Sequence, residues 1–420
     1  MAAARARRQS CAMTIPTEPA LEWAEWGKLR ARYETPRPRR MLALDGGGIR
    51  GILTLEVLEK IENDLRARYG GSSEFRLSQF FDYIGGTSTG AIIATALARG
   101  MSVKDVKAFY TDFGRQVFRK RPLLDRLRSL YENGPLERKL REVYGGDGDT
   151  NLKPEHLESL LLVVTRNATT DSAWPISSNP WAKYNRYTRK DCNLQIPLWK
   201  LVRASTAAPV YFSPEVIDWD TGDPSKSFVF VDGGTSAYNC PAFLMYRMAT
   251  EPAYRLGWER GERKLLIVSV GTGNAPVFGN EAESPDGNVV SGAVNTLLAL
   301  MNQARVDQDM NCRAVGRCTY GEPLDREVGS LVSEESPDKD TGRAFLYARY
   351  DAELTWSGLK RLGLETKIDA AKVNKLDAVD AISDLQQVGR ALADCVDVSK
   401  HFGMFADPSA LPLAPRKVTA

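Results

Sequence analysis

The sequence has few of the residues on which many active sites depend. It contains only two histidines, His156 and His401. The six cysteines are widely spaced and form no Cys-x-x-Cys pair, so zinc-binding and thioredoxin-like sites lack support. No run of eighteen apolar residues occurs, and no apolar region follows the N-terminal arginines, which argues against a membrane span and a secretory leader. We therefore expect a cytoplasmic protein that associates with membranes only peripherally.

The composition is that of an ordinary globular protein. The 420 residues are 43% hydrophobic and 26% charged, with a net charge of +3. So small a charge does not call for a nucleic acid polymer as partner, and we expect none. The chain divides into a basic N-terminal arm over residues 1–40, a main domain over 41–405 and a flexible, proline-containing tail over 406–420.

Apolar runs and helical periodicity alternate along the main domain. Apolar runs predict strands at residues 41–44, 80–84, 160–164, 228–231, 264–270 and 344–350. Periodic segments predict helices over residues 52–69, 91–98, 103–144, 293–315 and 376–396. Glycine-rich turns join the first strands to the helices that follow them. This succession predicts an α/β fold with a mainly parallel sheet.

A serine between two glycines stands at one of these strand-to-helix turns. The segment Gly86-Thr87-Ser88-Thr89-Gly90 matches the nucleophile-elbow pattern, in which a sharp turn exposes the serine hydroxyl. An ordinary glycine-rich turn is the alternative interpretation. If Ser88 attacks an ester, backbone amides must stabilise the oxyanion, and the glycines at 46–48 follow another strand and are suited to this role.

A serine nucleophile needs a base, and the sequence offers three carboxylates for it. Asp45, Asp82 and Asp232 all lie next to apolar strands, and Asp45 and Asp232 each precede glycines. Their residue type and local position do not separate Asp45 from Asp232. His401 follows Ser88 and Asp232 in the chain order of α/β-hydrolase triads, but its segment is expected to be peripheral.

The glycines from Gly46 to Gly51 also fit a dinucleotide-binding fingerprint. That fingerprint expects an acidic residue at the end of a second strand about 20 residues further on. Here the corresponding stretch closes a helix at Gly70-Gly71. No Lys-Ser/Thr pair follows the glycines, so a phosphate-binding P-loop is excluded as well.

Four motifs in this order resemble the patatin-like phospholipase family. They are Asp45-Gly46-Gly47-Gly48-Ile49-Arg50-Gly51, the elbow at Gly86–Gly90, the run Ala204–Pro209 with Val210-Tyr211-Phe212 after it, and Asp232-Gly233-Gly234. The likeness extends from about residue 40 to at least residue 275. It implies a three-layer α/β/α sandwich and a lipid acyl hydrolase that forms an acyl-serine intermediate.

The resemblance also implies roles for individual residues. Ser88 would be the nucleophile and Asp232 its base, in a Ser-Asp dyad without histidine. The oxyanion hole would come from Gly46, Gly47 and Gly48, and Arg50 would stabilise charge or a lipid phosphate unless it forms a structural salt bridge. No metal and no organic cofactor are implied. The substrate would be a phospholipid or another acyl lipid.

Two further functions remain open at this stage. Some bacterial members of the family are antiviral effectors that degrade membranes when a cyclic nucleotide binds, so a small-molecule activator is an option. A regulatory lipid-binding module without turnover is the other. Basic residues in the middle of the predicted helix 103–144, with Phe113, Val117, Phe118, Leu123 and Leu124, form either a solvated face or a surface that contacts anionic lipid.

Overall fold

The computed structural model describes residues 21–117, 131–146, 148–220, 222–275, 289–325, 327–335, 339–411 and 413. Nine strands form one sheet within this part of the chain, in the order β5-β6-β3-β2-β1-β7-β9-β8, with β4 paired to β3 beside that path. The strands are β1 Arg39–Leu44, β2 Tyr83–Thr87, β3 Leu160–Asn167, β4 Ser172–Ser177, β5 Glu215–Asp218, β6 Ser227–Asp232, β7 Leu265–Val270, β8 Arg317–Tyr320 and β9 Leu346–Tyr350.

The sheet is mixed, with a parallel centre. Strands β3, β2, β1, β7, β9 and β8 pair in parallel, whereas β4, β5 and β6 enter antiparallel pairs. All residues of β1, β2 and β7 are buried, as expected for strands covered by helices on both faces. The prediction of a mainly parallel α/β sheet is thus confirmed.

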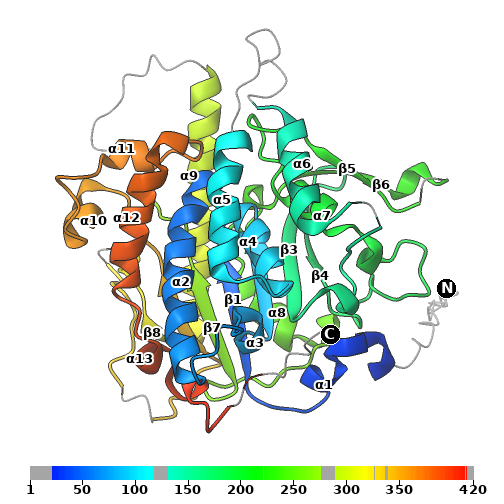
Figure 1. The fold of residues 1–420 in the computed structure, drawn as a ribbon, viewed down its shortest axis with the longest axis horizontal. Coiled ribbons are helices and arrows are strands. Elements are labelled where there is room, and N and C mark those ends of the chain that lie inside the picture. Colours follow the sequence, from blue (N-terminus) through cyan, green and yellow to red (C-terminus); the bar gives the residue numbers. More distant parts are fainter. Residues whose placement is uncertain are drawn as a thin grey trace, which may run out of the picture.

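Helices lie on both sides of this sheet (Figure 1). Helices α2, α4, α5 and α12 lie in front of it in this view. Helix α8 packs against β1 and β7, and α9 packs against β8 and β9. The helices are α1 Arg30–Tyr33, α2 Gly51–Arg68, α3 Leu77–Phe80, α4 Thr89–Ala98, α5 Val103–Val117, α6 Asn133–Tyr144, α7 Leu198–Ser205, α8 Ala242–Thr250, α9 Val289–Val315, α10 Trp356–Arg361, α11 Ala370–Val373, α12 Ile382–Ala393 and α13 Val398–Phe402. The arrangement is consistent with the expected three-layer α/β/α fold.

One strand prediction was displaced. In the apolar run at residues 80–84, which predicted a strand, Phe80 is the last residue of helix α3 and strand β2 begins only at Tyr83. A short apolar run does not distinguish a strand from a buried helical turn. Strand β2 continues through Gly85 and Gly86. Helix α8 approaches the strand closely at Gly85, where a Cβ would lie 2.5 Å from the sulfur of Met245.

The described part of the N-terminal arm packs onto the main body. A 3₁₀ helix, Trp23–Leu29, leads into α1, and Trp26, Leu29 and Tyr33 are buried. At the other end of the chain, the Leu411 carbonyl accepts a hydrogen bond from Arg40 at 2.6 Å. The predicted boundaries at residues 40 and 405 therefore run through packed structure, and the division into three parts stays a prediction. Residues 1–20 lie outside the described part.

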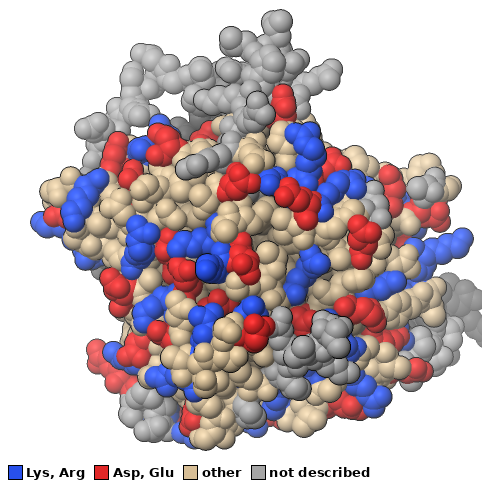
Figure 2. Space-filling view, in the orientation of Figure 1, with Lys and Arg blue, Asp and Glu red and all other residues tan. Residues whose placement is uncertain are grey.

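The predicted helix over 103–144 corresponds to two helices, α5 and α6. Residues 118–130, which carry five of its basic side chains together with Phe118, Leu123 and Leu124, lie outside the described residues. In the view of Figure 2, acidic and basic side chains alternate over the surface without forming one large area of a single sign. Within the described ranges, no helix is both long and apolar enough to cross a bilayer.

Candidate active site

The elbow at Ser88 is a strained turn between β2 and α4. Ser88 has φ 54° and ψ −121°, and it is the N-cap residue of α4. Close backbone packing requires the flanking glycines: a Cβ on Gly86 would lie 2.1 Å from the Gly90 carbonyl oxygen, and one on Gly90 would lie 2.3 Å from that of Leu44. The turn places the serine at the positive end of the α4 dipole, where negative charge is stabilised.

Strand β3 brings Ser88 and Asp232 together. Strand β4 pairs with one edge of β3, so the other edge holds β2 and then β6. Parallel β2 ends with Thr87 opposite Val164, and antiparallel β6 ends with Asp232 opposite Thr165. The two strands therefore approach from opposite directions and end at neighbouring positions. Because β6 runs antiparallel to β3, its carboxyl end meets that of β2 from the other side.

The two side chains are in direct contact. The Ser88 hydroxyl donates to Oδ2 of Asp232 at 2.5 Å, and the Gly234 amide donates to Oδ1 at 2.7 Å. Ser88 is 8% exposed and Asp232 is 2% exposed. Burial raises the pKa of Asp232 to about 6, although both donors and the more distant Arg203 act in the opposite direction. The carboxylate is thus more basic than usual and still ionised at neutral pH.

The other two carboxylates have cationic partners. Asp45 forms a bidentate ion pair with Arg349 of β9, with N–O distances of 2.8 and 2.6 Å. Asp82 precedes β2, at the opposite end of this strand from Ser88, and contacts Arg32 and Arg37. Burial alone would raise the pKa of Asp82, but the surrounding arginines lower it. Of the three carboxylates considered as a base, Asp232 thus contacts Ser88, whereas Asp45 and Asp82 are paired with arginines.

The glycine loop after β1 lies beside the serine. A Cβ on Gly46 would lie 3.2 Å from Cβ of Ser88, and Gly47 and Gly48 line the same cavity as the serine. The Gly46 amide already donates to the Asn239 carbonyl at 3.1 Å. For the amides of Gly47 and Gly48, we find no acceptor among the residues that the structure describes. Within the described structure, the loop thus keeps two amides without a partner at the wall of the cavity that Ser88 lines.

The Arg50 side chain is engaged with carbonyl oxygens of the glycine loop and of Asn374. Its guanidinium donates to the Gly47 carbonyl at 3.4 Å and to the side-chain oxygen of Asn374 at 3.1 Å. Burial lowers the pKa of Arg50 to about 10, so the guanidinium is still charged at neutral pH. It is absent from the residues that line the cavity at Ser88.

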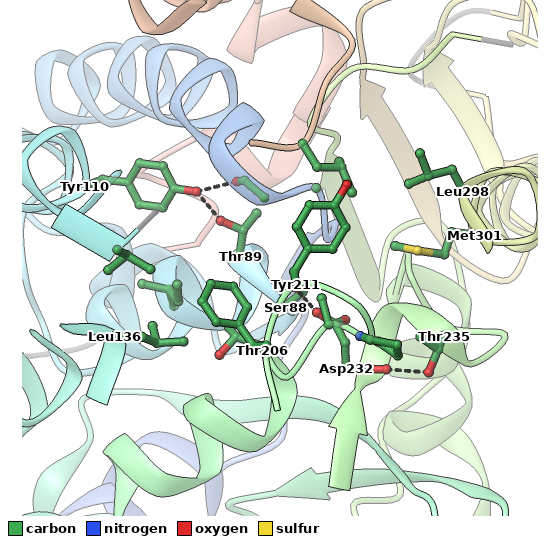
Figure 3. A pocket seen from close by; sticks show the side chains of 18 residues that line it. Ser88, Thr89, Tyr110, Leu136, Thr206, Tyr211, Asp232, Thr235, Leu298 and Met301 are labelled. Carbon is green, nitrogen blue, oxygen red and sulfur yellow. Dashed lines mark hydrogen bonds between the residues drawn. The ribbon is translucent and has the colours of Figure 1, made fainter. Parts of the chain in front are cut away.

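A largely apolar cavity opens above the two side chains (Figure 3). In this view Ser88 and Tyr211 lie near the centre, with Tyr110 and Leu136 on one side and Leu298 and Met301 on the other. Asp232 is the only carboxylate among the described lining residues, and none of them is lysine or arginine. The apolar lining residues are Ile92, Val117, Leu136, Ala208, Pro209, Phe212, Leu298, Met301 and Leu376.

Neither histidine lines this cavity. His401 is buried in α13, where its Nδ1 lies 2.8 Å from the hydroxyl of Tyr350 and its ring stacks on Tyr320. Burial lowers the pKa of His401 to about 4. His156 is in a 3₁₀ turn, Pro154–His156. In the described structure, the serine and its carboxylate meet without a histidine between them.

Several residues support the site through hydrogen bonds that the sequence did not indicate. The Ser88 amide donates to Oγ of Ser205 at 2.9 Å, and this hydroxyl donates in turn to the Val164 carbonyl at 2.6 Å. The run Ala204–Pro209 was one of the four sequence motifs, but nothing in it indicated this contact. Val210, in the same loop, has φ 72°, a strained value for a β-branched residue.

Comparisons with known proteins identify the kind of domain that contains these residues. Residues 42–246 match the model of the family described as patatin-like phospholipase. The chain carries a patatin-like domain. All four motifs that define the site, from Asp45 to Gly234, fall within the matched residues.

Curated relatives extend the comparison. Patatin-17 of Solanum cardiophyllum is 27% identical over 251 residues, which cover 57% of this chain and 61% of the relative. Patatin-2-Kuras 1 of Solanum tuberosum is 26% identical over 252 residues, which cover 57% of this chain and 63% of the relative. The match thus spans about three-fifths of these patatins. The crystal structure of VipD from Legionella pneumophila aligns with 84% of this chain and 67% of its own at 16% identity and a TM-score of 0.32, and we draw no argument from it.

Proposed function

We propose that this patatin-like protein is a lipid acyl hydrolase that cleaves fatty-acyl esters through an acyl-serine intermediate. The observation that carries the proposal is the 2.5 Å hydrogen bond from the Ser88 hydroxyl to the buried Asp232 carboxylate, at the base of an apolar cavity. An apolar lining suits an acyl chain. The patatin-like family consists generally of lipid acyl hydrolases, which supports the same conclusion.

In the proposed first step, Asp232 accepts the Ser88 proton while the serine oxygen attacks the ester carbonyl carbon. The carbonyl oxygen becomes an oxyanion, which the amides of Gly47 and Gly48 stabilise together with the α4 dipole. The tetrahedral intermediate then collapses. Its C–O bond to the alcohol breaks, Asp232 returns the proton to the leaving oxygen, and the acyl group stays on Ser88.

Water completes the proposed cycle. Asp232, again ionised, accepts a proton from a water molecule that attacks the acyl-serine carbonyl. A second tetrahedral intermediate forms and collapses, the proton passes to the Ser88 oxygen, and a fatty acid is released. Because Asp232 is the base in both half-reactions, kcat/KM should rise with pH through the pKa of this group, at about 6.

Fatty acid release from phosphatidylcholine and phosphatidylglycerol vesicles tests the proposal. Ser88→Ala and Asp232→Asn should each abolish release, whereas His156→Gln should match the wild type because His156 lies outside the cavity. Equal release by the wild type and Ser88→Ala would contradict the nucleophile assignment. A co-sedimentation arm with the same vesicles tests the proposed peripheral membrane contact. Parallel reactions with cyclic nucleotides test the small-molecule activator.

A further inference from the structure

The direction of a peptide amide can be deduced from the carbonyl on the same peptide plane. In a trans peptide, C=O and the following N–H point in opposite directions. A donor that fixes one carbonyl therefore also fixes the next amide in the chain. This relation makes the carbonyl contacts of the glycine loop informative about its donors.

Each of the three glycine carbonyls in the loop has a donor. The Thr272 hydroxyl donates to the Gly46 carbonyl at 2.9 Å, and the Arg50 amide donates to that of Gly47 at 3.3 Å. Tyr110 donates its hydroxyl to the Gly48 carbonyl at 2.5 Å (Figure 3). The contacts come from the loop after β7, from the 3₁₀ turn after the glycines and from α5.

These contacts fix three successive peptide planes. The plane that Tyr110 holds also contains the Ile49 amide, which donates to the Leu376 carbonyl at 2.8 Å. The other two planes contain the Gly47 and Gly48 amides, the two without an acceptor in the described structure. Of these, the Gly47 amide belongs to the plane that Thr272 holds.

Thr272 is itself held firmly. It is 3% exposed, and a Cβ on Gly47 would lie 2.0 Å from its hydroxyl oxygen, so the loop packs directly against this side chain. The preceding carbonyl, of Gly271, accepts from Thr54 at 2.7 Å, and the following amide, of Gly273, donates to Asp351 at 2.9 Å. Thr272 lies outside residues 42–246, so the family match assigns it no role.

We infer that Thr272 is a positioning residue that turns the Gly47 amide toward the oxyanion formed at Ser88. The inference builds on the proposed acyl transfer and adds a component from the second half of the chain. Thr272 touches no reacting atom. It acts through the Gly46–Gly47 peptide, because its hydroxyl holds the carbonyl on the opposite side of that plane.

A series of Thr272 variants tests the inference with p-nitrophenyl butyrate as substrate. Thr272→Val keeps the shape of the side chain and removes the donor, and kcat should fall about 10- to 100-fold with KM nearly unchanged, since one oxyanion donor is worth about 100- to 1,000-fold when it is lost completely. Thr272→Ser keeps the hydroxyl and should restore most of the rate. The acidic limb of the pH profile should stay at about pH 6, because Asp232 is untouched.

Thr250→Val is the matched control. Its hydroxyl donates to the Tyr246 carbonyl at 2.9 Å in α8, so the substitution also removes a buried threonine-to-carbonyl bond but lies away from the cavity. Its kcat should equal that of the wild type. If Thr272→Val does not fold, as judged by circular dichroism, Thr272→Ala removes the same hydroxyl without placing a methyl group there.

Wild-type kcat in the hydroxyl-free variants would overturn the inference, as would an equal loss in Thr272→Ser. A shifted acidic limb would also overturn it, because Thr272 would then act on Asp232. The small ester makes the result independent of the natural lipid. If vesicles give no fatty acid while the ester series behaves as expected, the lipid substrate is wrong and the positioning role stands.

Discussion

Replacing Asp232 by asparagine should make the protein more stable while it abolishes catalysis. The carboxylate is 2% exposed, and its pKa is raised from 3.8 to about 6 because burial disfavours its charged form. A difference of about 2 pKa units corresponds to about 3 kcal/mol of lost stability once the group is ionised in both states. Asparagine carries no charge and keeps an oxygen that accepts from the Gly234 amide.

The sign of the effect depends on pH. A carboxylate whose pKa is raised on folding contributes no penalty when it is protonated in both states, below pH 3.8. Between pH 3.8 and about 6, the carboxyl group is ionised in the unfolded chain but still protonated in the folded one, so the penalty grows as the pH rises. Above about pH 6 the group is ionised in both states and the penalty is constant. Asp232→Asn should therefore be more stable than the wild type by about 3 kcal/mol at pH 8 and by about half as much at pH 5.

Urea unfolding of both proteins at pH 8 and pH 5 measures this difference, because other titrating groups cancel between them. In a thermal scan at pH 8, a change of this size corresponds to an increase of about 3 °C in Tm for a chain of this length. The reasoning is refuted if Asp232→Asn is less stable than the wild type at pH 8. It is also refuted if the difference is the same at both values.

The remaining predictions concern the elbow, the buried ion pair and the histidine. Gly86→Ala should prevent folding, judged by soluble yield and circular dichroism, because its Cβ would lie 2.1 Å from the Gly90 carbonyl oxygen. Arg349→Met should cost about 3–5 kcal/mol in urea unfolding, because it leaves the Asp45 charge buried and unpaired. His401→Gln should reduce the loss of stability between pH 7 and pH 5. Burial lowers the pKa of His401 from 6.5 to about 4, so the neutral ring stabilises the folded state above pH 6.5. This contribution is lost as the pH falls, because the unfolded chain binds the proton first.

Two matched substitutions control the first two of these measurements. Gly134→Ala lies in α6, where a Cβ meets only Arg138 at 3.5 Å, and should fold normally. Arg30→Met removes a solvent-exposed ion pair to Glu34 and should hardly change the free energy of unfolding, because water screens such pairs. A Gly134→Ala yield as low as that of Gly86→Ala, or an equal cost for Arg30→Met and Arg349→Met, would contradict the packing argument. An unchanged acid response in His401→Gln would contradict the third prediction.

Local sequence signals predicted most of the central sheet. Apolar runs located β1, β3, β7 and β9, and the helical periodicity located α2 and α4 within one or two residues. Strands β5 and β8 were missed, since they are only four residues long and lack a continuous apolar run. The direction of β6 was not predictable either, because pairing with β3 decides it and no local pattern records that pairing.

The supporting contacts of the site depend on residues far apart in the chain. Ser205 reaches the Ser88 amide across 117 positions, and Thr272 reaches the Gly46 carbonyl across 226. A single hydroxyl in a loop carries no signal of the carbonyl it will meet after folding. Gly271-Thr272-Gly273 directly follows the apolar run at 264–270, but its contact with the glycine loop follows only from the pairing of β1 with β7.

Asp45 and Asp232 share a local sequence pattern but have different partners in the fold. Each is buried after an apolar strand and precedes glycines. Burial raises the pKa of both carboxylates. Arg349 lies 304 positions from Asp45 and engages both of its oxygens, so this carboxylate is already paired. Asp232 has no ion-pair partner among the residues described and accepts hydrogen bonds from the neutral donors of Ser88 and Gly234. A cation far away in the sequence thus decides whether a buried carboxylate is already paired or can still accept a proton. The local motif does not reveal that cation.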